Sequence, residues 1–275
     1  MQYYEPNFID EALVLLDRFG TNAHVLAGGT RLRFALRRGV SADAALINLK
    51  RIADLGRIED IASDLWIGPL VTAAALRRHV LVGKHAPLLA TTAASLGAAQ
   101  PQTVATIGGN IVSADPAADL VPALIAYSAD AEILSAGDCA RIATVEDIVS
   151  KRPALQGREL LGRIRVPIAP HRASYQKMTT RRGLEMALVS VAVSCRMDGA
   201  VVADARVALA GAAPSVVRAR GAERALIGSR LSSEVAQAAG ERAAADADPL
   251  TDARASAAYR RALVATLTQR AVMEL

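Results

Sequence analysis

Two pairs of adjacent glycines, each directly after an apolar run, constrain this chain more than any other feature of its sequence. The first pair lies in VLAGGTRL at 25–32 and the second in TIGGNI at 106–111. Glycine tolerates positive φ and lets a ligand approach the backbone closely, so successive N–H groups can converge on an anionic oxygen. A single pair more often marks a tight turn between core strands. Two such loops together predict a site that holds a pyrophosphate from both sides.

The common nucleotide-binding fingerprints are missing from both glycine loops. Neither loop has the form GxGxxG at the start of a helix, and neither has the form GxxxxGK[ST]. A nucleotide site built from these loops is therefore of another kind.

The pattern of apolar residues and turn signals predicts an α+β chain. An amphipathic helix is expected after Asn7, with Asn7 as its N-cap and Gly20 as its stop. The run at 103–107 is β-prone and enters the second glycine pair as a strand. Further strands are expected at 24–27, 45–49, 58–62, 65–68, 129–134, 163–167, 186–197 and 201–210. Further helices are expected at 72–78, 87–97, 216–226, 233–245 and 253–273.

Composition excludes several classes of function. The net charge of +5 is scattered, without the basic runs and interleaved aromatics of a nucleic-acid groove, although an acidic partner subunit remains possible. Cys139 and Cys195 lie far apart without metal-ligand spacing, so we expect no metal site in this chain. The N-terminus lacks the basic and apolar segments of a signal peptide, which predicts a cytoplasmic protein. Apolar stretches fall short of the roughly 20 residues that span a bilayer, so no membrane span is expected.

Three motifs carry a family resemblance: AGGT at 27–30, TIGGN at 106–110 with SADPAAD at 113–119, and YQK at 175–177. In order and spacing they resemble the FAD-binding (medium) subunits of the xanthine dehydrogenase and carbon monoxide dehydrogenase family of molybdenum hydroxylases. The resemblance covers essentially the whole chain. It implies a two-lobed FAD-binding domain of the molybdopterin dehydrogenase or vanillyl-alcohol-oxidase-like type at 1–167, with lobes at about 1–52 and 53–167. A C-terminal α+β flavoprotein domain with a small, three-stranded antiparallel sheet is expected at 168–275.

The resemblance also implies which residues contact FAD, and it assigns no catalytic side chain and no metal ligand. The first loop contributes Val25, Leu26, Ala27, Gly28, Gly29, Thr30, Arg31 and Leu32. The second loop contributes Thr106, Ile107, Gly108, Gly109 and Asn110. Single-residue matches add Leu96, Asp119, Leu161, Tyr175 and Lys177.

Four of these residues have an alternative interpretation. Asp119 is expected to accept hydrogen bonds from cofactor hydroxyls, or else to cap a helix at 120–126. Lys177 would stabilise negative charge on the reduced flavin ring, although most lysines only cover surface. Tyr175 would cover a flavin face or lie in the core. Arg31 departs from the family pattern, which leaves both phosphate pairing and an outward orientation open.

The family implies a heterotrimer, or a dimer of it, with a large molybdopterin subunit and a small iron–sulfur subunit. This chain would take electrons from the iron–sulfur subunit and pass them to NAD, a quinone or oxygen. Molybdopterin and iron–sulfur clusters are expected only in the partners, so the substrate pocket lies in another chain. Two alternatives remain: a stand-alone flavin oxidoreductase, and a scaffold subunit that has lost FAD. Valine at both Gly28 and Gly109 is expected to abolish FAD retention while the fold survives.

Overall fold

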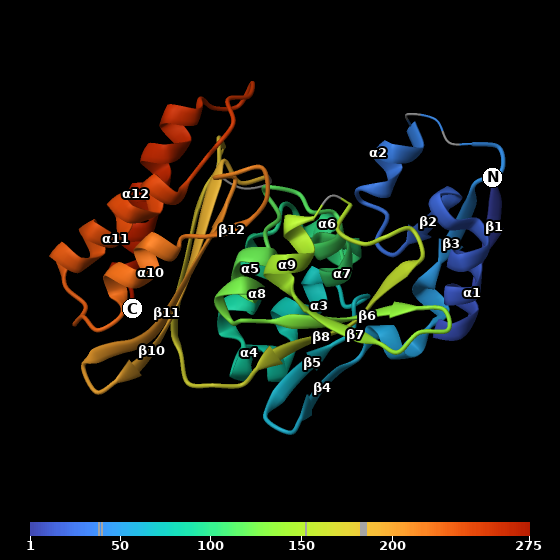
Figure 1. Ribbon diagram of the computed structural model, residues 1–275, viewed down its shortest axis with the longest axis horizontal. Helices are drawn as coiled ribbons and strands as arrows, with labels where there is room; N and C mark the ends of the chain where they lie inside the picture. The colour runs from blue at the N-terminus through green and yellow to red at the C-terminus, as the bar shows by residue number, and fades with distance from the viewer. Residues whose placement is uncertain (38, 40, 152, 182–185) are drawn as a thin grey trace.

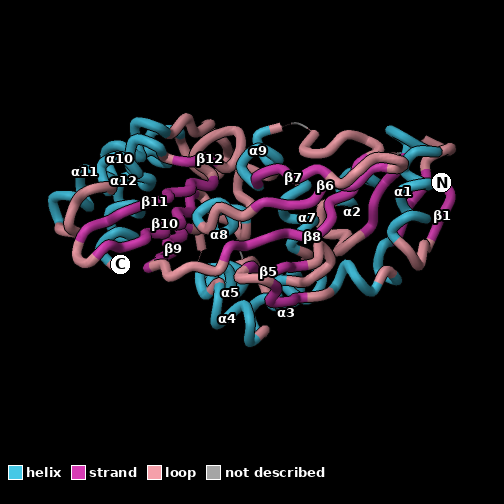
Figure 2. The backbone as a smooth tube through the Cα atoms, turned by 60° about the horizontal axis from the view of Figure 1, so that its bottom comes forward, coloured by secondary structure: helices cyan, strands magenta, loops and turns pink. Residues whose placement is uncertain are grey.

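The computed structural model describes residues 1–37, 39, 41–151, 153–181 and 186–275. Within these residues the strands form three sheets, which follow one another along the long axis of the molecule (Figure 1, Figure 2). The N-terminal lobe lies at one end of that axis, and the C-terminal helices lie at the other. The α+β fold class predicted from the sequence is confirmed.

The N-terminal lobe is a small parallel sheet with the strand order β1-β3-β2. Leu16 of the first helix packs with Ile47 of the sheet in a small core. That helix begins one residue later than predicted: Phe8 is the N-cap, and the Asn7 N–H donates to Glu11 at 2.8 Å. Gly20 ends the helix at φ +50°, as predicted. The elements are β1 (Gln2–Tyr4), α1 (Ile9–Phe19), η1 (Gly20–Asn22), β2 (Ala23–Leu26), α2 (Leu32–Arg37), β3 (Ala45–Asn48), η2 (Leu49–Arg51) and η3 (Ala53–Gly56).

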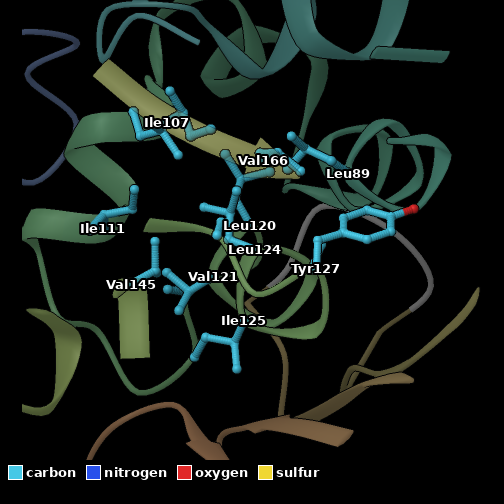
Figure 3. Close-up of a cluster of buried hydrophobic side chains, with 14 of the residues drawn as sticks. Leu89, Ile107, Ile111, Leu120, Val121, Leu124, Ile125, Tyr127, Val145 and Val166 are labelled. Atoms are coloured by element: carbon cyan, nitrogen blue, oxygen red, sulfur yellow. The ribbon is translucent and has the colours of Figure 1, made fainter. Parts of the chain in front are cut away.

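The middle lobe has an antiparallel sheet with the order β4-β5-β8-β6-β7 and short helices packed on it. Its core is a continuous cluster of Leu, Ile, Val and Ala side chains around the helices that follow the second glycine pair (Figure 3). The strands are β4 (Ile58–Ile61), β5 (Asp64–Ile67), β6 (Asp130–Ser135), β7 (Arg141–Thr144) and β8 (Glu159–Pro167). The helices are α3 (Ala73–Arg78), α4 (Val80–His85), α5 (Pro87–Ser95), α6 (Ala99–Val104), α7 (Ile107–Val112), α8 (Val121–Ala126) and α9 (Val145–Ser150).

The strand predicted at 103–107 is wrong. Residues 103 and 104 end α6, and Thr106 is the N-cap of α7, where its side-chain oxygen accepts a hydrogen bond from the Gly109 N–H at 3.1 Å. A threonine at an N-cap satisfies one of the free donors of the first helical turn. This cap outweighs the strand preference of the β-branched residues around it.

The C-terminal region is an antiparallel sheet with α10–α12 on one face and α8 on the other (Figure 1). Among the described residues this sheet has four strands rather than the three expected. The helix predicted at 216–226 begins only at Arg220, because Val217 pairs with Leu209 of the neighbouring strand. The elements are β9 (Arg172–Met178), β10 (Val189–Asp198), β11 (Val201–Ala210), β12 (Val217–Arg218), α10 (Arg220–Leu226), α11 (Ser233–Asp246) and α12 (Ala257–Met273).

The helices of the described residues reach 17 residues at most, in α12. In the described part of the chain, none of them combines the length and the apolar character that crossing a bilayer requires.

A candidate cofactor cleft between the two glycine loops

A cleft of about 510 Å³ lies where the N-terminal lobe meets the middle lobe, and its size suits a small-molecule or cofactor site. Both glycine loops line it, together with the segment at 113–119 and the turn that leads into β8. The cleft thus brings together segments that are far apart in the sequence. The predicted site residues that line it are Val25, Ala27, Gly28, Gly29, Thr30, Arg31, Leu32, Leu96, Thr106, Gly108, Gly109, Asn110, Asp119 and Leu161.

Strand β2 delivers the first glycine loop into the cleft. Gly29 has φ +73°, a conformation that residues with a side chain rarely adopt. Within the described residues, the N–H groups of Gly28, Gly29 and Thr30 have no hydrogen-bond acceptor in the protein. This loop therefore presents free backbone donors to an anionic group in the cleft.

Gly28 also has a packing role that the sequence did not reveal. A Cβ atom at this position would lie 1.9 Å from the carbonyl oxygen of Val104. Only a glycine lets the first loop pack this closely against the backbone that precedes the second loop. The expectation that valine at Gly28 would spare the fold is therefore wrong, because the substitution would force the two loops apart.

The second glycine loop is the first turn of α7, and its N–H groups are already used inside the protein. Ile107 donates to Val71 O at 2.9 Å, Gly108 donates to Pro69 O at 2.9 Å, and Gly109 donates to the Thr106 side chain. The prediction that the N–H groups of this loop also converge on an anion is therefore wrong.

The two glycines of the second loop face different surroundings. Gly108 is buried, and a Cβ there would lie 2.6 Å from the Pro69 side chain. Gly109 is exposed on the cleft wall, and a Cβ there would meet only the Thr106 side-chain oxygen, at 3.0 Å. Of this pair, Gly109 is the residue that allows a ligand to approach the backbone.

Asp119 reaches the cleft with a buried positive partner. Its Oδ1 lies 2.6 Å from Lys177 Nζ, which also donates to the Ser95 carbonyl oxygen at 2.9 Å. Both side chains are about 9% exposed. Burial raises the pKa of Asp119, and the positive charge of Lys177 opposes that rise. Asp119 does not cap α8, because Leu120 is the N-cap and its side chain makes no cap hydrogen bond.

Four predicted site residues do not line the cleft. Lys177 lies behind Asp119, and Ile107 is fully buried in the middle core. Leu26 is the last residue of β2, and its Cδ1 lies 3.1 Å from the Cβ position of Gly29. Tyr175 packs against the middle core, and burial raises the pKa of its hydroxyl. The structure therefore favours the core alternative for Tyr175.

Arg31 points to a carboxylate of the opposite segment. Its Nη2 lies 2.8 Å from Asp115 Oδ2, and the Arg31 side chain is 57% exposed against 12% for Asp115. Asp115 lines the cleft but was not predicted as a site residue, although it lies in the quoted SADPAAD motif. The turn at 155–157 and the partly exposed Met186 also line the cleft, and no sequence signal marked them.

These residues fit FAD in their chemistry. Free N–H donors suit a pyrophosphate, the Asp119 carboxylate suits sugar or ribityl hydroxyls, and leucine side chains from several segments give the cleft apolar walls. In the part of the chain that the structure describes, no cluster of three His, Cys, Asp or Glu side chains could hold a metal ion. The donor set therefore suits an organic, phosphate-bearing cofactor.

Known proteins match over the whole chain. Residues 1–169 match the family model described as the FAD-binding domain in molybdopterin dehydrogenase, and residues 173–275 match the CO dehydrogenase flavoprotein C-terminal domain. The carbon monoxide dehydrogenase medium chain of Afipia carboxidovorans is 30% identical over 98% of this chain and 94% of its own length. The xanthine dehydrogenase FAD-binding subunit of Escherichia coli O157:H7 is 27% identical over 99% and 94%.

Solved structures agree with these matches. A carbon monoxide dehydrogenase chain from Hydrogenophaga pseudoflava superposes with a TM-score of 0.93 at 30% identity, covering 99% of this chain and 96% of that one. A chain of quinoline 2-oxidoreductase from Pseudomonas putida 86 gives a TM-score of 0.91 at 25% identity, covering 99% and 95%. Sequence and fold thus point to the same family over the full length.

Proposed function

Because the chain belongs to the family of FAD-binding subunits of molybdopterin dehydrogenases, we propose that it binds FAD in the cleft described above and carries electrons from a partner iron–sulfur subunit to an external acceptor. One observation carries the proposal: both glycine loops and Asp119 line a single cleft. The acceptor we propose is NAD, a quinone or oxygen.

FAD supplies the redox chemistry when it is bound, so the protein's part is to bind and orient it. The free N–H groups of the first loop would hold the pyrophosphate. Gly109 would let the cofactor approach α7 closely. Asp119 would accept hydrogen bonds from cofactor hydroxyls, and Lys177 keeps that carboxylate in place and opposes its protonation. Leu96 and Leu161 contribute apolar wall from the middle lobe.

The partners proposed are a large molybdopterin subunit and a small iron–sulfur subunit, assembled as a heterotrimer or a dimer of it. Several relatives are named as medium chains or subunits, such as the nicotine 6-hydroxylase medium subunit of Paenarthrobacter nicotinovorans, which supports this assembly. We also propose a division into an FAD-binding domain at 1–167, with lobes at about 1–52 and 53–167, and a C-terminal domain at 168–275.

The test is the visible absorption spectrum of the purified chain, with the mass of any released cofactor. Flavin bands and a mass equal to that of FAD are the expected result. A colourless protein that also fails to bind added FAD would contradict the proposal and support a scaffold that has lost the cofactor.

The stand-alone alternative is tested by purification from the native source under mild conditions. We expect two further subunits to accompany the chain, one with molybdenum and one with iron and sulfide by elemental analysis. A chain that purifies alone, retains FAD and reduces a small molecule by itself would favour an independent flavoenzyme.

A further inference from the structure

We propose that Arg31 and Asp115 form an ion-pair clasp that holds two cleft-lining segments together and slows the release of FAD. The proposal rests on the FAD function proposed above. Arg31 lies in the first glycine loop, directly after Thr30, and Asp115 lies three residues beyond the end of α7. Both residues line the cleft, and their side chains meet at 2.8 Å. This ion pair therefore connects the wall that carries the free N–H donors to the wall that carries Asp119.

The Asp115 end of the clasp is fixed. Its Oδ1 accepts a hydrogen bond from the Ala117 N–H at 2.9 Å, and its main-chain oxygen accepts one from Ala118 at 3.0 Å. The next residue, Pro116, accepts a hydrogen bond from the Gly211 N–H at 2.6 Å, which ties this segment to the C-terminal sheet. Asp115 therefore presents its Oδ2 to Arg31 at a defined position, with little conformational entropy left to lose.

The Arg31 end is the free end. Its side chain is more than half exposed, so the guanidinium lies at the rim of the cleft while its partner lies deeper. A long side chain on a glycine-rich loop can swing away without disturbing the core. Opening the clasp would thus release the Arg31 end of the first loop, whereas closing it holds that end against Asp115 at the cleft.

The charges in the cleft support the same arrangement. The negative charge of Asp115 is close enough to Asp119 to raise the pKa of Asp119. Lys177 pairs with Asp119, and Arg31 pairs with Asp115, so each carboxylate has its own cation. An unpaired Asp115 would repel a pyrophosphate bound at the first loop. The clasp thus closes the cleft and neutralises a charge that opposes the cofactor.

A direct bond from Arg31 to a cofactor phosphate is the competing arrangement. The two arrangements differ in what Asp115 does. In the clasp, Asp115 helps to retain FAD, so its loss weakens retention, but less than the loss of Arg31, which leaves the Asp115 charge unpaired. In the competing arrangement Asp115 draws Arg31 away from the phosphate, so its loss strengthens retention.

The experiment measures the rate at which FAD leaves the full-length chain, from the rise in flavin fluorescence after dilution. The variants are Arg31→Ala, Asp115→Ala and the exchanged pair R31D/D115R. The control is Arg57→Ala, which removes an exposed arginine that pairs with Asp54 at 2.9 Å away from the cleft. Circular dichroism and thermal unfolding confirm that each variant is folded.

We expect each single alanine variant to release FAD about two- to fivefold faster, the range that a partly exposed ion pair supports. The exchanged pair should recover part of the loss, because it restores the ion pair but not the hydrogen bond from the Ala117 N–H. Arg57→Ala should behave as the wild type. High salt should remove the difference between wild type and variants. Unchanged or slower release from Asp115→Ala, while Arg31→Ala releases faster, would overturn the clasp in favour of direct phosphate contact.

The failure of the clasp differs from the failure of the proposed function. If all variants retain FAD and release it at the wild-type rate, the clasp is wrong and the cofactor site stands. If the wild-type chain binds no FAD at all, both proposals are wrong.

Discussion

Among the described residues, three N–H groups of the first glycine loop have no acceptor, whereas the second loop uses its own N–H groups inside the protein. Gly28, Gly29 and Thr30 donate to no acceptor among the described residues, but Ile107, Gly108 and their neighbours donate to Val71, Pro69 and Thr106. The first loop can therefore bind an anion through these backbone N–H groups. The second loop contributes through the open surface at Gly109 and through the side chains that follow it.

The difference shows that the same Gly-Gly dipeptide serves two purposes in this molecule. It allows close packing of the backbone at some positions and close approach of a ligand at others. Gly28 and Gly108 are the packing members, because a Cβ at either would overlap neighbouring backbone or proline atoms. Gly109 is the open member, and Gly29 supplies the positive φ that the first loop requires. A Gly-Gly motif therefore has to be divided residue by residue before a substitution can test ligand binding.

The largest expected effect tests whether the cleft wall that follows the second glycine loop depends on the ion pair between Asp119 and Lys177. Lys177→Met would leave the Asp119 carboxylate buried without its cation, which we expect to cost about 3–5 kcal/mol of unfolding free energy at neutral pH. Urea unfolding measures it, with the exposed Lys84→Met as control. A loss no greater than that of the control would show that this wall does not depend on the pair.

The pH dependence of the same variant gives a further check. Burial already raises the pKa of Asp119 in the folded state, and losing Lys177 raises that pKa more. A carboxyl group whose pKa is raised in the folded state stabilises that state at low pH, and this contribution is lost as the pH rises. The stability gap between wild type and Lys177→Met should therefore be smallest near pH 4 and should grow toward pH 7. An equal gap at both pH values would contradict the buried-pair interpretation.

The next largest effect concerns the packing glycine of the first loop. Gly28→Ala would place a Cβ 1.9 Å from Val104 O, and overpacking of this kind costs about 3 kcal/mol. We expect lower thermal stability together with loss of FAD. The control is Gly83→Ala in α4, where a Cβ meets nothing within 4 Å. Wild-type stability in Gly28→Ala would remove the distinction between packing and open glycines.

The smallest expected effect on the fold belongs to the open glycine. Gly109→Ala should weaken FAD binding about tenfold, equivalent to about 1.4 kcal/mol, by occupying the surface that the cofactor approaches. Its thermal stability should fall far less than that of Gly28→Ala, because its Cβ meets only the Thr106 side-chain oxygen, at 3.0 Å. Titration with FAD measures the affinity. Unchanged affinity would show that the cofactor does not approach α7 here.

Local signals predicted much of the fold. Gly20 stops α1 because a glycine takes the positive φ that ends a helix. The helix predicted at 72–78 forms as α3, with Thr72 as its N-cap. The run at 103–107 was misjudged because its β-branched residues resemble a strand. Its structure is set by the cap at Thr106 and by packing against Pro69, which lies far away in the sequence.

The loops of the site could be predicted from the sequence, but its ion pairs could not. Both glycine pairs can be recognised in the amino-acid sequence alone, and they do line the cleft. The partner of Arg31 is Asp115 and the partner of Asp119 is Lys177, and each pair joins segments that only the fold brings together. The packing role of Gly28 likewise depends on Val104, so periodicity and spacing contain no signal for it.

The hydrogen bond from the Gly211 N–H to Pro116 O has a consequence for how such chains can diverge or be recombined. Gly211 has φ +69°, and a Cβ there would lie 2.2 Å from Leu188 O, so this position does not accept another residue freely. Through Gly211 and Lys177, the C-terminal sheet supports the cleft segment that carries Asp115 and Asp119. Consider a chimera that joins this chain's first two lobes to the C-terminal region of a relative. It should keep its cleft geometry only where the relative has both a lysine at the position of Lys177 and a glycine at the position of Gly211.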